Sequence, residues 1–154
     1  MMHMPKPAEG HRRLEALAGT WVGEERMYPS DWDPVGGTAI GRTTSRIAVG
    51  GFALVTDYEQ ERDGAVTFSG HGVFTFDSGK DEYSLFWLDS IGSPPEIFAG
   101  GFTGDVLTLA HAGPPMHVRL IWDLSKPGTL QSSMEMSADG VEWKKLFDAV
   151  YERS

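Results

Sequence analysis

The sequence predicts an all-β protein, an antiparallel up-and-down barrel of ten strands preceded by one short helix. Its 154 residues include 19 glycines and 11% aromatic residues, more turn capacity and ring surface than a helical bundle needs. After residue 19, nine turn signals, among them Asp63-Gly64 and Asp139-Gly140, divide the chain into short segments. Within these segments apolar and polar residues alternate, as in strands buried on one face.

Residues 8–18 form the one stretch with helical periodicity, which Gly19 is expected to end. The expected strands are 20–28, 38–48, 52–62, 65–76, 81–89, 96–102, 106–111, 116–124, 129–137 and 141–152. The links between them are too short to cross a sheet, so neighbours in sequence should pair antiparallel. Closing such a meander into a barrel removes both exposed edges. A two-sheet sandwich is the alternative, but its crossings need a longer link.

Composition and charge exclude several classes of function. The chain has no cysteine, which rules out disulfides and thiolate chemistry. Its net charge of −9 disfavours binding to nucleic acid or to an anionic membrane. With neither a signal peptide nor a membrane span in the sequence, we expect a cytoplasmic protein, with a disordered tail at 1–7 and one domain at 8–154. Phosphate loops, nucleophile elbows and zinc-protease motifs do not occur.

Strand alternation also predicts the lining of the barrel. The side chains expected to contact a ligand in the lumen are Met27, Phe74, Trp87, Trp122, Met134 and Trp143. Trp32 lies in the longest link, 29–37, and either gates the mouth or holds this loop to the rim. Gly70 and Gly72 leave a gap that a neighbouring ring fills or that stays open for a ligand.

Strand 81–89 is apolar on both faces, with Tyr83, Leu85 and Trp87 on one and Phe86 and Leu88 on the other. A strand of this kind is usually covered on both sides. The outer cover is either the helix at 8–18 or a second subunit, so a homodimer is expected.

One inward carboxyl is the first candidate for chemistry. Glu25 shares the face of Trp21, and a buried carboxylate needs a partner or a raised pKa. Arg46 and Arg42 are the expected partners, with Tyr58 on the next strand. Such a group orients a ligand carboxylate or carbonyl, or supplies the acid and base of a small-molecule reaction. A structural ion pair across adjacent strands is the alternative.

The histidines are the second candidate. His3 and His11 are expected in solvent, whereas His71, His111 and His117 lie on strands or at their ends. Three inward histidines would form a metal site, but the alternation puts His71 and His117 on the outer face, so no metal is expected. A bulge in strand 65–76 would turn His71 inward and make it a general base.

The sequence resembles known families both in short motifs and over most of its length. Gly19-Thr20-Trp21, with Arg153 at the end of the last strand, resembles the closing device of the calycin barrels, the lipocalin and fatty-acid-binding superfamily, in which a basic side chain stacks on the tryptophan. Over residues 10–153 the chain resembles the bacterial family of domain of unknown function 1579. This resemblance rests on three blocks in order: HRRLEALAGTWVGEERMYP, GRTTSRIAVGGFALVTDYEQ and SADGVEWKKLFDAVYER. It implies a lipocalin-like barrel and no established activity.

The block GTWVGEERMYP also resembles the nitrobindins, ten-stranded calycin barrels that hold haem. That resemblance implies an axial histidine on the C-terminal strands. Residues 128–154 contain no histidine, and only Tyr151 or Met134 could nominally replace it. We therefore expect no cofactor.

Three functions follow from the sequence. The first is binding of a small apolar or aromatic molecule in the lumen, oriented by Glu25, Arg46 and Tyr58. The second is an enzyme of isomerase, cyclase or hydrolase type that uses these residues in the same cavity. The third is a homodimeric structural protein with a packed core.

Overall fold

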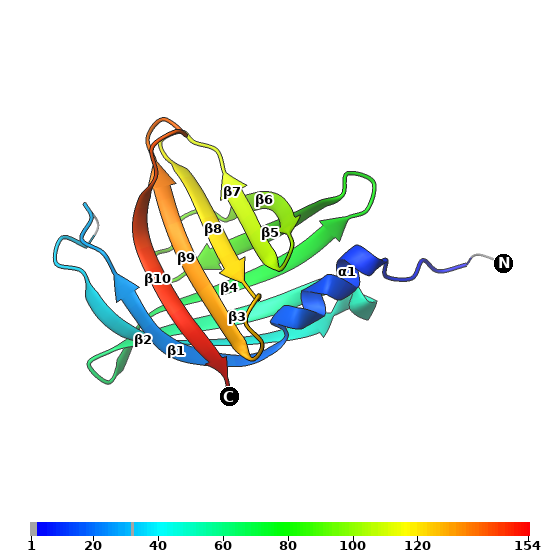
Figure 1. The fold of residues 1–154 in the computed structure, drawn as a ribbon, viewed down its shortest axis with the longest axis horizontal. Helices are drawn as coiled ribbons and strands as arrows, with labels where there is room; N and C mark the ends of the chain where they lie inside the picture. The colour runs from blue at the N-terminus through cyan, green and yellow to red at the C-terminus, as the bar shows by residue number, and fades with distance from the viewer. Residues whose placement is uncertain (1–2, 32) are drawn as a thin grey trace.

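The computed structural model describes residues 3–31 and 33–154 and confirms the expected barrel (Figure 1). Ten antiparallel strands close in the order β1-β10-β9-β8-β7-β6-β5-β4-β3-β2. Their bounds are β1 Gly19–Met27, β2 Gly37–Ala48, β3 Ala53–Arg62, β4 Ala65–Asp77, β5 Glu82–Asp89, β6 Glu96–Thr103, β7 Val106–His111, β8 His117–Asp123, β9 Thr129–Ser137 and β10 Lys144–Arg153. A 3₁₀ turn, η2 (Val49–Gly51), joins β2 to β3.

The N-terminal helix is shorter than the periodicity predicts. Only Glu9–Arg13 forms an α-helix, α1, and the chain then tightens into a 3₁₀ helix, η1 (Leu14–Leu17). Residues three apart eclipse each other in a 3₁₀ helix, so Leu14 and Leu17 point the same way. Both are buried against the end of the barrel.

Trp21 plugs the barrel beside this helix. The Arg153 guanidinium lies 4.2 Å from the centre of the Trp21 ring and donates hydrogen bonds to the carbonyls of Ala18 (2.6 Å) and Ala16 (3.1 Å). The Trp21 indole N–H donates to the Leu17 carbonyl at 3.1 Å. This end of the barrel is therefore closed by a stacked cation that also satisfies the last helical carbonyls.

The apolar core fills the closed half. Leu54, Leu85, Leu107 and Leu109 are almost fully buried. Beside them the rings of Phe74 and Trp122, on strands from opposite sides of the barrel, meet edge to face with 5.3 Å between their centres. Nearer the other end the inward-facing side chains are only partly buried, and we call them the cup: Met27, Tyr58, Gln60, Phe68, Trp87, Met134 and Phe147. These side chains are therefore less completely enclosed than those of the closed half.

Two described residues of the link between β1 and β2 bond to side chains of other strands. Tyr28 donates a hydrogen bond to Asp148 on β10 at 2.7 Å, and Asp33 forms an ion pair of 2.9 Å with Arg62. Trp32, the expected gate, lies outside the described residues. No helix in the described part of the chain is long and apolar enough to cross a membrane.

The N-terminal helix does not cover the outer face of β5, so this one of the two predictions for that face is wrong. The helix α1 lies at the closed end of the barrel (Figure 1) and leaves Phe86 and Leu88 on the outer wall, each 41% exposed. Ile97, the partner of Phe86 in β6, is 58% exposed. The outer face of β5 and β6 therefore carries apolar side chains that the helix does not cover.

Candidate functional site

Glu25 forms the floor of the cup and is completely buried. The Tyr58 hydroxyl lies 2.7 Å from each carboxylate oxygen, and the Gln60 amide nitrogen donates to Oε1 at 3.0 Å. The Tyr151 hydroxyl donates to Oε2 in a short hydrogen bond. All three neighbours act as donors, an arrangement that suits an ionised carboxylate.

Strand register brings these side chains together. Glu25 pairs with Ala39 on β2 and with Ala149 on β10, two small residues that leave the carboxyl group room. Gly41 is essential for the same reason, since a Cβ there would lie 2.0 Å from the Glu25 carboxylate. Tyr58 and Tyr151 then reach the carboxylate from either side of β1.

Burial controls the protonation of this group. Desolvation raises the pKa of Glu25, while the hydrogen bonds from Tyr151, Tyr58 and Gln60 and the charge of Arg62 act in the opposite direction. Burial, followed by the negative charge of Glu25, raises the pKa of both tyrosines. Both hydroxyls therefore stay protonated and serve as donors at neutral pH.

Arginine does not pair with Glu25 as the sequence predicted. Arg46 and Arg42 are exposed on the outer wall, because the inward positions of β2 are Gly41, Thr43 and Ser45. Among the described residues no basic side chain forms an ion pair with Glu25. The structural ion pair considered as an alternative is therefore also absent from the described residues, and neutral donors take its place.

Two residues that act on Glu25 were not predicted from the sequence. Gln60 lies two residues beyond Tyr58 on the inward face of β3, so strict alternation could have identified it. Arg62 stands at the rim, where its charge acts on Glu25 and Tyr58. Its guanidinium is held by Asp33 at 2.9 Å, so this cation is neutralised locally.

Aromatic rings form one wall of the cup. The Tyr58 ring lies 6.0 Å from Phe68 and 6.4 Å from Trp87, measured between ring centres. The Trp87 indole N–H donates to Asp89 at 2.9 Å, which fixes the ring. Trp87 fills the space over Gly70, where a Cβ would lie 2.1 Å from the indole. The gap left by this glycine is thus occupied by a neighbouring ring.

The other residues expected to line the lumen divide into three groups. Met27 and Met134 belong to the cup, whereas Phe74 and Trp122 form its lower boundary. Trp143 is on the outer wall, and its ring stacks on Arg119 at 4.1 Å. A bulge in β10 between Lys145 and Phe147 reverses the alternation, so that Phe147 faces inward and Trp143 does not.

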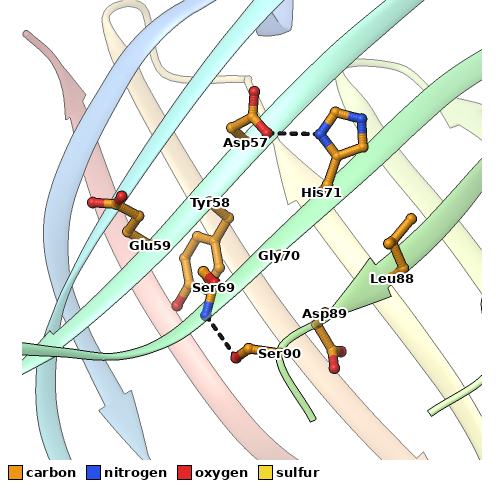
Figure 2. A pocket seen from close by; sticks show the side chains of 9 residues that line it. All are labelled: Asp57, Tyr58, Glu59, Ser69, Gly70, His71, Leu88, Asp89 and Ser90. Carbon is orange, nitrogen blue, oxygen red and sulfur yellow. Dashed lines mark hydrogen bonds and ion pairs between the residues drawn. The ribbon is translucent and has the colours of Figure 1, made fainter. Parts of the chain in front are cut away.

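The histidines lie apart from the cup and from one another. Figure 2 shows His71 on the outer wall, bonded through Nδ1 to Asp57 at 2.6 Å, beside an open hollow of about 500 Å³. The register shift in β3 and β4 falls at Gln60 and Glu61, too far away to turn His71 inward. His111 contacts the Ile97 carbonyl and His117 lies beside Gly140. No three potential ligands gather for a metal within the described ranges.

His11 was expected in solvent and is instead buried. Its ring packs edge to face on Phe52 at 4.9 Å and on Phe76 at 5.2 Å, and Nδ1 accepts a hydrogen bond from the Ala8 amide. The histidine therefore ties the start of α1 to the barrel.

Comparison with known proteins places the chain in a family. A family model described as "Protein of unknown function (DUF1579)" matches residues 6–153. The chain belongs to this family. The fold is also similar to the crystal structure of Rv2717c from M. tuberculosis, with a TM-score of 0.66 and 19% identity, covering 96% of this chain and 98% of that chain. At this identity the likeness concerns the fold alone. No curated protein matches the chain.

The residues present do not suit haem coordination at the position that the nitrobindin resemblance suggested. Tyr151 is 4% exposed, and its hydroxyl donates to Glu25. A tyrosine that ligates iron must present its oxygen to the metal instead. Met134 is partly buried in the cup and belongs to its apolar lining.

Proposed function

We propose that the protein binds a small, mostly apolar or aromatic molecule in the cup. The observation that carries this proposal is the buried carboxyl of Glu25 beneath an aromatic wall whose residues are only partly buried. Binding sites for small molecules combine apolar walls with a few fixed polar groups, and the cup has this composition. Tyr58 and Gln60 are its polar groups within reach of a ligand.

Native mass spectrometry of freshly purified protein tests the proposal, because a retained ligand adds its mass to that of the chain. A thermal-shift screen of aromatic metabolites then supplies compounds for titration. Trp87→Ala should weaken their binding by about tenfold or more, since one aromatic wall is lost. Trp143→Ala is the matched control, because this tryptophan lies on the outer wall. Equal effects of both substitutions, or no compound that binds, would contradict the proposal.

An enzyme is the second candidate, favoured by one specific observation. Burial raises the pKa of Glu25, and a carboxyl with a raised pKa is a better proton donor to a substrate than an ordinary surface carboxyl at the same pH. Glu25 has no exposed surface, so a proton would pass through the Tyr58 hydroxyl. Incubation of a cup ligand with the protein, followed by mass and chiral analysis, separates an enzyme from a carrier. Recovery of unchanged ligand supports binding alone.

We also propose three broader assignments. The stacking of Arg153 on Trp21 supports a place among the calycin-like barrels. The negative charge supports a protein with no nucleic-acid or membrane partner, for which we propose a cytoplasmic location. The exposed Phe86, Leu88 and Ile97 support a homodimer that buries the outer wall of β5 and β6.

A further inference from the structure

The cup presents hydrogen-bond acceptors to its contents. The Tyr58 proton is directed at Glu25, and the hydroxyl oxygen accepts a hydrogen bond from the Gln60 amide at 3.0 Å, which leaves this oxygen one further lone pair. The Gln60 amide nitrogen faces Glu25 at 3.0 Å, the Tyr58 oxygen at 3.0 Å and the Met27 sulfur at 3.8 Å. Within the described part of the chain the Gln60 carbonyl oxygen makes no side-chain hydrogen bond, so it remains free to accept one from a ligand.

The charges around the cup also favour a ligand that donates hydrogen bonds, in particular a cation. Glu25 is a fully buried carboxylate without an ionic partner among the described residues. Arg62, whose charge acts on it, is paired with Asp33 at the rim. The chain as a whole carries a net charge of −9. A second negative charge in the cup would be repelled, whereas a positive charge would be attracted.

The aromatic wall adds an independent argument. On one side of the cup, the centre of the Tyr58 ring lies 6.0 Å from that of Phe68 and 6.4 Å from that of Trp87. The faces of such rings attract cations, and ammonium groups are commonly recognised by aromatic side chains. The buried carboxylate, the free acceptor atoms and the aromatic rings thus all favour a cationic ligand that donates hydrogen bonds.

We infer that the cup selects a small organic ammonium compound with an aromatic or apolar body, and that it discriminates against carboxylates. This inference rests on the proposed binding function and narrows its ligand class. The ammonium group donates to the Tyr58 hydroxyl and the Gln60 carbonyl and lies against the neighbouring Trp87 ring, while the body packs on Phe68 and Met27. Glu25 acts as a positioning residue, because it orients both hydroxyl protons away from the ligand and supplies the balancing charge.

Three probes of similar size test the selectivity: 2-phenylethylammonium, 2-phenylethanol and 3-phenylpropanoate. Their dissociation constants are measured by calorimetry up to about 10 mM, near the weak limit for molecules of this size. The ammonium probe should bind at least about tenfold more tightly than the carboxylate probe, because of the nearby buried charge. Glu25→Gln should bring the two affinities close to parity. Glu24→Gln removes the same charge from the exposed outer face of the same strand and should leave the ratio within about twofold.

Tyr58→Phe is a second variant that removes the acceptor without changing the formal charge. It should weaken the ammonium probe more than the carboxylate probe, and circular dichroism confirms that the barrel is folded. Binding of the carboxylate or the alcohol in preference to the ammonium would overturn the inference and leave the cup as a binding site. A preference for ammonium that survives Glu25→Gln would also overturn it. If no probe binds, both the inference and the proposed binding function fail for molecules of this size.

Discussion

Removal of one hydroxyl group tests how the buried carboxyl is stabilised. Tyr151→Phe deletes a donor to Glu25 at a point where the two side chains are 4% and 0% exposed, so water cannot readily replace it. A hydrogen bond to a charged group contributes about 1.5–3 kcal/mol to stability. For a domain of this size, each kcal/mol shifts Tm by about 2–4 °C. The expected loss is therefore about 3–12 °C.

Tyr28→Phe is the matched control. Its hydroxyl also donates to a carboxylate, that of Asp148 at 2.7 Å, but the Asp148 side chain is 34% exposed and also lies 3.4 Å from Lys145. Water and the lysine remain available after the substitution, so the loss should stay below about 1 kcal/mol. Urea unfolding of both variants, with unchanged m-values, gives the comparison. Equal losses in the two variants would refute the reasoning.

The effect of Tyr151→Phe should also depend on pH. Burial raises the pKa of Glu25 above its usual value of 4.5, and loss of a donor to the carboxylate raises it further. The pKa of Glu25 is thus lower in the folded wild type than in the folded variant. At a pH between these two pKa values the variant still holds a proton on Glu25 that the wild type has released. The destabilisation caused by Tyr151→Phe therefore grows as pH rises from the lower pKa to the higher one. Below both values the carboxyl is neutral, and the loss falls to about 0.5–1.5 kcal/mol. A loss independent of pH would show that the charge on Glu25 does not matter.

Two further predictions concern packing and association. Gly41→Ala should destabilise the barrel by about 1–3 kcal/mol, since its Cβ would meet the Glu25 carboxylate at 2.0 Å, whereas Gly101→Ala, with nothing within 4 Å, should be nearly neutral in urea unfolding. Equal midpoints for both variants would contradict the packing argument. Phe86→Ser should convert the proposed dimer to a monomer in size-exclusion chromatography with light scattering, while Val150→Ser, on the outer wall of β10, should not. A monomeric wild type would rule out the dimer.

The fold was predictable because turn chemistry and alternation agree along most of the chain. Asp63 and Gly64, for example, both adopt positive φ in the turn between β3 and β4, as the sequence suggested. The last strand is the exception, since β10 begins at Lys144 rather than at residue 141. The carboxylate of Asp139 accepts hydrogen bonds from the amides of Val141 and Glu142, so these residues remain in the turn. Local capping of this kind overrides β propensity.

The candidate site was predictable only where alternation was unbroken. Glu25 and Tyr58 lie on strands with regular register up to the cup, and their inward direction followed from counting residues. The same counting excludes Arg46 from the cup, because this residue pairs with Val55 on the outer wall. Arg46 was predicted as a partner of Glu25 for its charge rather than for its position on the strand. Trp143 was misplaced because a bulge carries no clear signal in a single sequence.

The carboxyl at the floor of the cup is not required by the barrel itself. Deeper in the barrel, Ser45 donates a hydrogen bond to Thr56 at 2.8 Å, a buried pair that satisfies both hydroxyl groups without charge. Glu25, in contrast, carries a desolvation cost that its neighbours only partly offset, as its raised pKa shows. A buried carboxyl whose ionisation opposes stability, although three donors surround it, supports the proposed role toward the contents of the cup more than a role in the fold. Positions that oppose stability in this way are typical of binding and catalytic sites.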